Sequence, residues 1–247
     1  MRLTKKNFAV LEKFEFEMPP VGVKFFRKRP DGLERLATTM AFCEMLKAAQ
    51  EGNAFYADAK NHTCDAGLYV LGQTEAPKQY LNGAFGSGLK IFADPRAASR
   101  LYDYIPRLGK RVANYVAFAP LDKLVFDPDV LIILAHVRQT EIILRAVSYK
   151  TGTVWSSRFS PAIGCAWIYI YPYLSGEPNY TITGLGHGMK RRKIFPEGMQ
   201  IIALPLAVLP SIFRTLEEMP WVLPSYKADG ETFVRKLLVK LGLAPAE

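Results

Sequence analysis

The chain has 247 residues, of which 49% are apolar and 22% are charged, and its formal net charge is +9. This composition excludes a disordered chain and suits a folded protein with one large domain or two small ones. No apolar run approaches the roughly 18–20 residues that a membrane span needs, so we expect no membrane segment. The first residues lack the apolar core of a signal peptide, which predicts a cytoplasmic protein.

The basic charge narrows the expected partners. The chain has 32 lysine and arginine residues against 23 acidic ones, a balance that suits an anionic small molecule, an acidic partner protein or nucleic acid. The basic residues are widely spread, and no RNP, zinc-finger or helix-turn-helix pattern accompanies them. We therefore expect an anionic small molecule or a redox partner protein rather than nucleic acid, and the sequence leaves a homo-oligomer open.

The first half of the chain alternates between strand and helix patterns. Apolar spacing predicts a helix at 3–16, which the two prolines at 19 and 20 end. The elements expected next are a strand at 21–26, a helix at 38–50 capped by Thr38 or Thr39, a strand at 54–57, a small helix that ends at Gly72, a strand at 89–92 and a helix that Asp94 caps and Pro95 opens.

The second half continues the alternation. The elements expected there are strands at 115–119, 130–135, 153–157 and 199–203, helices at 138–149, 205–219 and 232–241, and an apolar, aromatic segment at 165–174. Pro210 is placed to kink the helix at 205–219. Together the elements predict an α+β fold with mixed sheets flanked by helices.

An internal repeat organises these elements. Residues 88–97 match residues 198–207 without gaps, with glycine, isoleucine, alanine and proline in the same places. Upstream, the Leu-Lys-Ala at 46–48 matches the Leu-Arg-Ala at 144–146, and Cys64 then falls opposite Cys165. The order predicts two degenerate strand–helix–strand repeats, 1–120 and 121–247, packed about a pseudo-twofold axis as one unit or two subdomains. Chance similarity between strand–helix units is the alternative.

Three cysteines are candidates for chemistry. Their odd number and the absence of an export signal argue against a disulfide framework. Cys64 and Cys165 each precede an apolar run with helical character, where unpaired N–H groups at a helix start favour a thiolate. Cys43 lies inside the helix expected at 38–50, where an inert buried thiol is the simpler interpretation.

Convergence of the three thiols would create a metal site. Three thiolates can hold a 4Fe–4S cluster with one open iron, or a 3Fe–4S cluster, and three thiolates with His62 or His187 would suit zinc. The cysteines are, however, 21 and 101 residues apart, with no Cys-x-x-Cys pair. Structural burial and a nucleophilic cysteine therefore stay open as alternatives.

A glycine-rich basic loop at 183–193 is the second candidate. Its glycines allow backbone N–H groups to surround an anion, and Lys190 and Arg191 would neutralise it. His187 stands between two glycines and is sterically accessible. The spacing matches neither dinucleotide-binding nor P-loop patterns, so a surface turn with solvated charge is the alternative. No catalytic motif accompanies either candidate, and the sequence names no reaction.

Four motifs resemble a known family. They are Pro19-Pro-Val-Gly-Val-Lys24, Phe42-Cys-Glu-Met-Leu-Lys-Ala-Ala-Gln-Glu-Gly52, His62-Thr-Cys64 with Gly67, and Pro172-Tyr-Leu-Ser-Gly-Glu-Pro-Asn179. In this order they resemble DUF169 (archaeal conserved region, ArCR), prokaryotic proteins of undetermined function that are frequent in anaerobes. The resemblance implies a shared cysteine site at Cys43, Cys64 and Cys165 and a recurrent lysine at Lys24. Where the family often has Cys-Pro-Gly-Gly, this chain has Cys64-Asp-Ala-Gly67.

Two hypotheses follow. The first is a cytoplasmic iron–sulfur or metal-binding protein, with Cys43, Cys64 and Cys165 as ligands between the halves and a role in redox chemistry or cofactor handling; zinc is the less favoured metal. The alternative is a metal-free protein that holds an anionic metabolite or cofactor between the halves, using Lys24, His187, Lys190 and Arg191.

Overall fold

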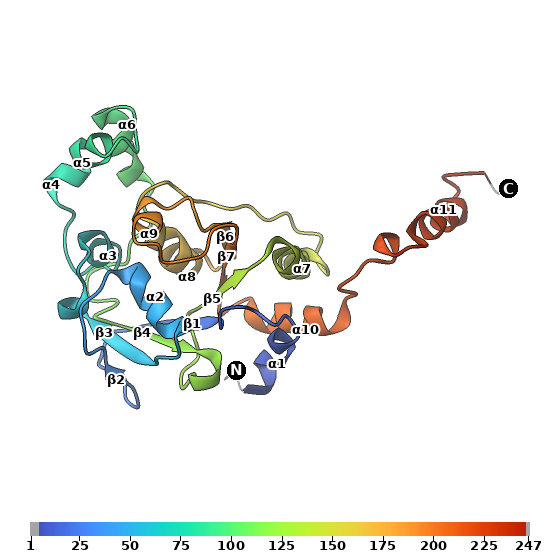
Figure 1. Cartoon of the computed structure of the whole chain (residues 1–247), viewed down its shortest axis with the longest axis horizontal. Helices are drawn as coiled ribbons and strands as arrows, with labels where there is room; N and C mark the ends of the chain where they lie inside the picture. The colour runs from blue at the N-terminus through green and yellow to red at the C-terminus, as the bar shows by residue number, and fades with distance from the viewer. Residues whose placement is uncertain (1–4, 246–247) are drawn as a thin grey trace.

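A computed structural model describes residues 5–245 of the chain, with side chains from residue 8 onward. Within this part, seven strands form one mixed sheet and helices cover both of its faces (Figure 1). The predicted α+β class is therefore confirmed. Residues 3 and 4 of the helix expected at 3–16 lie outside the described residues. Every described helix is too short or too polar to span a membrane.

The strands are β1 (Val21–Phe26), β2 (Glu34–Arg35), β3 (Phe55–Asp58), β4 (Tyr115–Pro120), β5 (Val130–Ala135), β6 (Asn179–Ile182) and β7 (Gln200–Pro205). The α-helices are α1 (Lys5–Glu12), α2 (Phe42–Gln50), α3 (Asp65–Val70), α4 (Lys78–Leu81), α5 (Ala84–Gly88), α6 (Pro95–Arg100), α7 (Val137–Ser148), α8 (Tyr171–Ser175), α9 (His187–Arg191), α10 (Leu209–Glu218) and α11 (Gly230–Lys240). A π-helix, η4 (Ala166–Ile170), runs directly into α8.

The sheet has the strand order β2-β3-β4-β1-β5-β7-β6. Only β2 and β3 pair in parallel, and the other neighbours are antiparallel. Strand β1 lies at the centre, where Val23 faces Phe118 of β4 and Val130 of β5. The sheet is thus continuous across residue 120, where the sequence suggested a boundary, and the division into halves stays a prediction.

The central strand β5 shows how the core is built. All six of its residues are buried. Val130, Ile132 and Leu134 face the layer that contains α2 and η4, whereas Leu131 and Ile133 face the layer of α1, α7 and α10. A strand covered on both faces needs apolar residues at every position, and each fully buried side chain contributes roughly 1.5–3 kcal/mol.

Several elements lie where the sequence predicts them. Strands β1 and β5 have the expected bounds, and α7 and α11 differ from expectation by one or two residues. Asp94 caps α6, since its side chain accepts a hydrogen bond of 2.8 Å from the backbone N–H of Ala97. Pro210 occupies the first turn of α10 rather than its interior, so it does not kink the helix.

The strand expected at 89–92 is wrong. Helix α5 ends at Gly88, and Lys90 adopts a left-handed backbone conformation with φ of 57° that a strand cannot contain. The gapless match of 88–97 with 198–207 therefore aligns a turn with strand β7. This correction removes the sequence alignment that suggested the repeat, and the pseudo-twofold axis stays a prediction.

The strand expected at 153–157 is also wrong. This segment has no regular structure, and Val154 is 92% exposed. Just after this segment, the backbone N–H of Arg158 donates to the side-chain oxygen of Asn179 at 2.9 Å, and not to a backbone carbonyl of a neighbouring strand. The sequence missed β6, α4, α5 and α9, which are short elements rich in polar residues and glycine.

Candidate functional site

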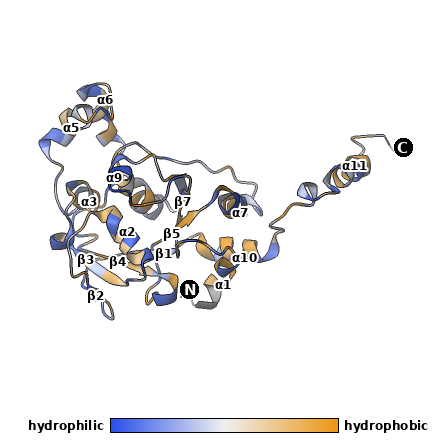
Figure 2. Ribbon diagram, in the orientation of Figure 1, coloured by the Kyte–Doolittle hydropathy of each residue, from blue (hydrophilic) through white to orange (hydrophobic). Residues whose placement is uncertain are grey.

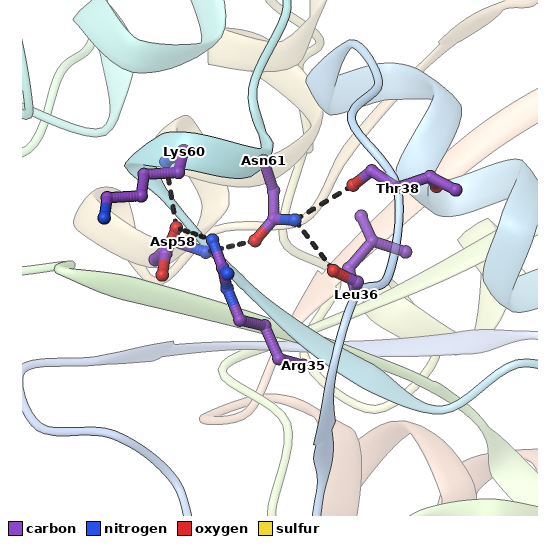
Figure 3. A network of polar contacts seen from close by, with 6 residues as sticks. All are labelled: Arg35, Leu36, Thr38, Asp58, Lys60 and Asn61. Atoms are coloured by element: carbon purple, nitrogen blue, oxygen red, sulfur yellow. Dashed lines mark hydrogen bonds and ion pairs between the residues drawn. The ribbon is translucent and has the colours of Figure 1, made fainter.

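A polar network fixes the chain that leads into α2 against the turn that follows β3 (Figure 3). Asn61 donates two hydrogen bonds through its amide nitrogen, to the carbonyl oxygens of Leu36 at 2.8 Å and Thr38 at 2.9 Å. Its amide oxygen accepts from the backbone N–H of Asp58 at 3.2 Å, and the Asp58 carboxylate pairs with Arg35 at 2.8 Å. A single buried amide therefore joins two segments that are about 25 residues apart.

Backbone hydrogen bonds extend this pairing to the first two cysteines. The N–H of Met40 donates to the carbonyl of Asn61 at 2.9 Å, and the N–H of Thr63 donates to the carbonyl of Met40 at 3.1 Å. The segments that precede Cys43 and Cys64 thus run side by side. This local pairing is the reason that α2 and α3 begin next to each other.

All three cysteines lie at the starts of helical segments. Cys43 is the second residue of α2, Cys64 is the N-cap of α3, and Cys165 precedes η4. Helix α2 begins at this point because the Glu44 carboxylate accepts a hydrogen bond of 2.6 Å from the N–H of Ala41. The predicted positions of Cys64 and Cys165 before helices are confirmed, as is Cys43 within a helix.

The three thiols are electrostatically coupled. Burial is the main cause that raises the pKa of Cys43 to about 12, with an opposing effect from Arg192 and smaller upward effects from Cys64 and Glu44. Burial also raises the pKa of Cys165 well above its usual value, and ionised Cys64 and Cys43 would add to that rise. Cys43 and Cys165 are therefore protonated at neutral pH, chiefly because burial disfavours the charged thiolate.

A buried tyrosine adjoins the thiols. Tyr169 in η4 is fully buried, and its ring lies 4.6 Å from the ring of Phe42. Its hydroxyl has no hydrogen-bond partner among the described residues. Burial raises its pKa, and the charges of Cys43 and Cys165 raise it further, so the hydroxyl lies within electrostatic range of both sulfurs. An unpaired buried hydroxyl costs about 1–3 kcal/mol and is uncommon in native proteins.

The ring nitrogens of His62, which packs against the same Phe42 ring, are buried and also lack hydrogen-bond partners among the described residues. The two ring centroids are 5.6 Å apart. Burial lowers the pKa of His62 to about 4, with a small opposing effect from Asp58. His62 is therefore neutral at pH 7, which leaves a lone pair free on one ring nitrogen.

A cavity of about 440 Å³ opens beside Cys64. Its size is typical of sites for small organic ligands, which are about 300–1,000 Å³. Its lining combines apolar side chains from α5, α6 and the turn between them with polar groups from α3, α4 and α9. The lining residues that matter most here are Cys64, Tyr80, Phe85, Phe92, Tyr102, His187, Arg191 and Arg192.

The cavity brings together both sequence candidates. His187 and Arg191 line it with Cys64, because α9 carries the basic stretch to this side of the molecule. Lys190 lies on an adjoining cavity that shares His187 and Arg191, and its nitrogen is 3.9 Å from Glu197. The glycine-rich loop is thus partly helical, and its backbone is tied down where the N–H of His187 donates to the carbonyl of Pro161 at 2.8 Å.

Lys24 lies elsewhere. Its ammonium group is 3.5 Å from the carboxylate of Asp129 and donates to the carbonyl of Asp127 at 2.8 Å. It is not among the residues that line the cavity beside Cys64. The structure therefore brings Cys43, Cys64, Cys165, His187 and Arg191 into one region and leaves Lys24 in an ion pair on the sheet.

Sequence reasoning missed Tyr169 and did not single out Arg192 within the basic run. Arg192 belongs to the basic run that was singled out, and it both lines the cavity and acts on Cys43. Only the tertiary structure distinguishes it from its neighbours. Tyr169 stands in an apolar, aromatic run, where nothing in the sequence separates a packing tyrosine from one with an unpaired hydroxyl.

The placement of the possible ligand side chains can be compared with what a single metal ion and an iron–sulfur cluster each need. Within residues 5–245, no group of three or more His, Cys, Asp and Glu side chains is placed so that it could hold a metal ion. A single zinc ion needs all its ligands within about 2.0–2.3 Å of one atom. The ligands of an iron–sulfur cluster bind different irons and stand farther apart. The described side chains are therefore not grouped as a single metal ion requires.

These features define an α+β protein with a continuous mixed sheet and a small-molecule cavity beside three thiols. The chain belongs to DUF169, described as uncharacterised ArCR, whose family model matches residues 10–214. It is similar to MJ0308 of Methanocaldococcus jannaschii, an uncharacterised protein, with 28% identity over 214 residues that cover 84% of this chain and 91% of that protein. No solved structure matches the chain.

Proposed function

We propose that this protein binds an iron–sulfur cluster through Cys43, Cys64 and Cys165. The observation that carries the proposal is that the fold brings together segments whose cysteines are 21 and 101 residues apart in the sequence. Backbone hydrogen bonds pair the segments before Cys43 and Cys64, and the ring of Phe42, next to Cys43, lies 4.6 Å from that of Tyr169, in the helix that follows Cys165. Buried thiols with raised pKa values are unstable as isolated thiolates, and a bound cationic cluster supplies the charge that lets them ionise. The reducing cytoplasm that we expect for this protein would keep the thiols free.

Two neighbouring residues support this assignment. Arg192 acts on Cys43 with a positive charge, which offsets the negative charge of a thiolate-ligated centre. The Tyr169 hydroxyl has a donor without an acceptor, and thiolate or sulfide sulfur would accept its hydrogen bond. A bound centre would therefore give the Tyr169 hydroxyl the acceptor that it lacks, and would add a negative group to the Glu44 carboxylate that already lies 3.9 Å from Arg192.

The cavity gives the centre a route to small molecules. Cys64 lines the cavity, whereas Cys43 and Cys165 are buried. Three cysteines leave one iron of a 4Fe–4S cluster without a cysteine ligand, and such an iron can bind an external ligand. We propose a role in redox chemistry or cofactor handling, in which this cavity admits the substrate and Arg191 and His187 orient it.

We further infer that the two halves are related by topology, in a register that differs from the sequence alignment. The first half runs β1, α2, β3, α3, β4 with spatial order β3-β4-β1. The second runs β5, η4 with α8, β6, α9, β7 with the mirrored order β5-β7-β6, and α7 is an insertion after β5. Helices α2 and η4 lie on the same face of the sheet. This register pairs the helix of Cys43 with that of Cys165, and Cys64 with His187.

The inferred relation has a direct test. Rotation of one half about an axis between β1 and β5 in an experimental structure should superpose α2 on the helix at 164–175. A misfit of these helices, with the strands superposed, would reject the relation. If the relation holds, His187 occupies the corner of the site that corresponds to Cys64.

Anaerobic purification tests the cluster. We expect brown protein with iron and acid-labile sulfide, and we expect C64S and C165S to lose both. K193Q is the matched control, because Lys193 follows the same basic stretch without lining the cavity, and it should retain the cluster. Wild-type protein that stays colourless and iron-free after reconstitution with iron and sulfide would refute the proposal.

The second candidate is metal-free binding of an anionic metabolite or cofactor. Arg191 favours it, because this cavity-lining cation has no hydrogen-bond or ion-pair partner among the described residues. The apolar walls and cationic groups together suit an anion with an aromatic or aliphatic body. Colourless protein that co-purifies with such a compound, and loses it in R191Q but not in C165S, would support this candidate over the cluster.

A further inference from the structure

Helix α11 exposes an apolar stripe away from the body of the protein. Figure 1 shows α11 at the end of an arm that follows α10, and Figure 2 colours it in both hydrophobic and hydrophilic shades. Its large apolar side chains are 37–43% exposed within the helix and more so just after it: Phe233, Val234, Leu237, Leu238, Leu241 and Leu243. Spacings of three and four residues place these side chains on one face, a pattern that a soluble helix normally buries.

A groove of matching character lies on the body. It has a volume of about 520 Å³ and is formed by α1, the segment after it and the turn that follows β4. Phe16 and Leu121 supply its accessible apolar surface, and the buried Phe8 and Leu11 form its floor. Three carboxylates lie on its rim, from Glu12, Glu15 and Asp122.

Charge complementarity relates the helix to the groove. Helix α11 carries Arg235, Lys236 and Lys240 against a single acidic residue, Glu231. Two copies of such a helix would repel each other, whereas the acidic rim of the groove attracts it. An apolar stripe with basic flanks thus has its complement on the same chain.

The arm begins beside the groove. The Trp221 ring, just after α10, stacks on the ring of Phe14 at 4.3 Å, next to the segment that forms the groove. A twofold axis that passes beside this surface would place the arm of each copy close to the groove of the other. Reciprocal exchange of this kind closes the assembly and leaves no free groove or helix.

We propose that α11 of one copy packs into the groove formed by α1 of a second copy, and that the protein is a reciprocal twofold dimer. The interface buries the apolar stripe of each α11 against the groove of the other chain, where Phe16 and Leu121 are only partly buried. Lys236 and Lys240 pair with the acidic rim. This proposal is independent of the cluster and the cavity.

Light scattering coupled to size-exclusion chromatography tests the dimer with the full-length chain. We expect twice the mass of one chain, and we expect L237E to shift the protein to monomer with at least a tenfold weaker association. V154E is the matched control, since Val154 is 92% exposed and lies outside both surfaces, and it should leave the mass unchanged. Circular dichroism confirms that each variant is folded.

Charge reversal identifies the groove as the partner of α11. We expect K236E/K240E and E12K/E15K each to weaken the dimer, and the four substitutions combined to restore it. A wild-type monomer at every concentration would overturn the proposal, and so would a dimer insensitive to L237E or a quadruple variant that is weaker than both doubles. Binding of monomeric wild type to vesicles of anionic lipid would assign α11 to a membrane surface and would also overturn it.

Discussion

The unpaired hydroxyl of Tyr169 gives the sharpest test of the thiol site. In the metal-free protein it is fully buried and has no partner among the described residues. A buried hydroxyl without a hydrogen bond costs about 1–3 kcal/mol, and Y169F keeps the ring while it removes this cost. We therefore expect Y169F to raise the free energy of unfolding of metal-free protein by about 1 kcal/mol or more.

The loaded protein should respond with the opposite sign. A hydrogen bond from Tyr169 to a charged sulfur is worth about 1.5–3 kcal/mol, and Y169F removes it. We expect Y169F to lose its cluster faster than wild type and to lower the reduction potential, because hydrogen bonds to sulfur stabilise the reduced state. Urea unfolding of metal-free protein, and the decay of visible absorbance with potentiometry of the loaded form, measure the two effects.

A control separates this reasoning from a general effect of tyrosine replacement. Tyr171 is two residues away, and its hydroxyl pairs with Glu177 at 2.7 Å. We expect Y171F to destabilise the metal-free protein by about 0.5–1.5 kcal/mol, since it removes a satisfied hydrogen bond. If Y169F destabilises the metal-free protein as much as Y171F does, its hydroxyl has a partner in that state and the argument for a missing group fails.

Three further predictions concern the same region. The pKa of His62 is lowered to about 4, so the unfolded chain binds one more proton between pH 4 and about 6.5. Stability therefore falls across this window on acidification, by at most about 3.4 kcal/mol. Acid unfolding of H62F should lack this component, and an unchanged pH dependence would refute it. In metal-free protein, iodoacetamide should modify Cys64 much faster than Cys43, because burial raises the Cys43 pKa to about 12. Peptide mass spectrometry measures the ratio of the two modification rates, and equal rates would contradict the burial argument. G83A should destabilise the packing of helices α4 to α6 by about 1 kcal/mol or more, because a Cβ at Gly83 would lie 1.9 Å from a backbone oxygen and its φ is +77°. G88A is the control, because a Cβ at Gly88 meets nothing within 4 Å. Limited proteolysis should cut G83A but not G88A within 78–104, and equal resistance would refute this.

The sequence predicted the position of an element correctly where a single strong local pattern specified it. The six buried apolar residues of β5 and the Asp94-Pro95 start of α6 lie where they were predicted, because a continuous apolar run and a capping motif each act within a few residues. The strand expected at 89–92 failed for a local reason as well. Its Leu-Lys-Ile-Phe sequence has strand propensity, but the left-handed Lys90 breaks the extended chain.

The candidate site could be predicted only in part. The sequence identified Cys64, Cys165, His187 and Arg191 as residues of interest, and all except Cys165 line one cavity. The repeat register was unreliable because a gapless match cannot distinguish a turn from a strand. Lys24 was a candidate through family resemblance, and its position on β1 ties it to Asp129 instead.

The sequence alone determined that this chain folds as an α+β protein, where strands β1 and β5 lie in the chain and which residues have reactive or charged side chains of interest, because these depend on composition and short-range patterns. Only the tertiary structure decided that Cys43 and Cys64 adjoin through the Asn61 network, that Tyr169 meets the thiols without a partner, and that α9 brings Arg191 to their cavity. Those contacts join residues about 20 to 130 positions apart, and no local pattern encodes which of many distant pairs the packing of a sheet and its helices will bring together.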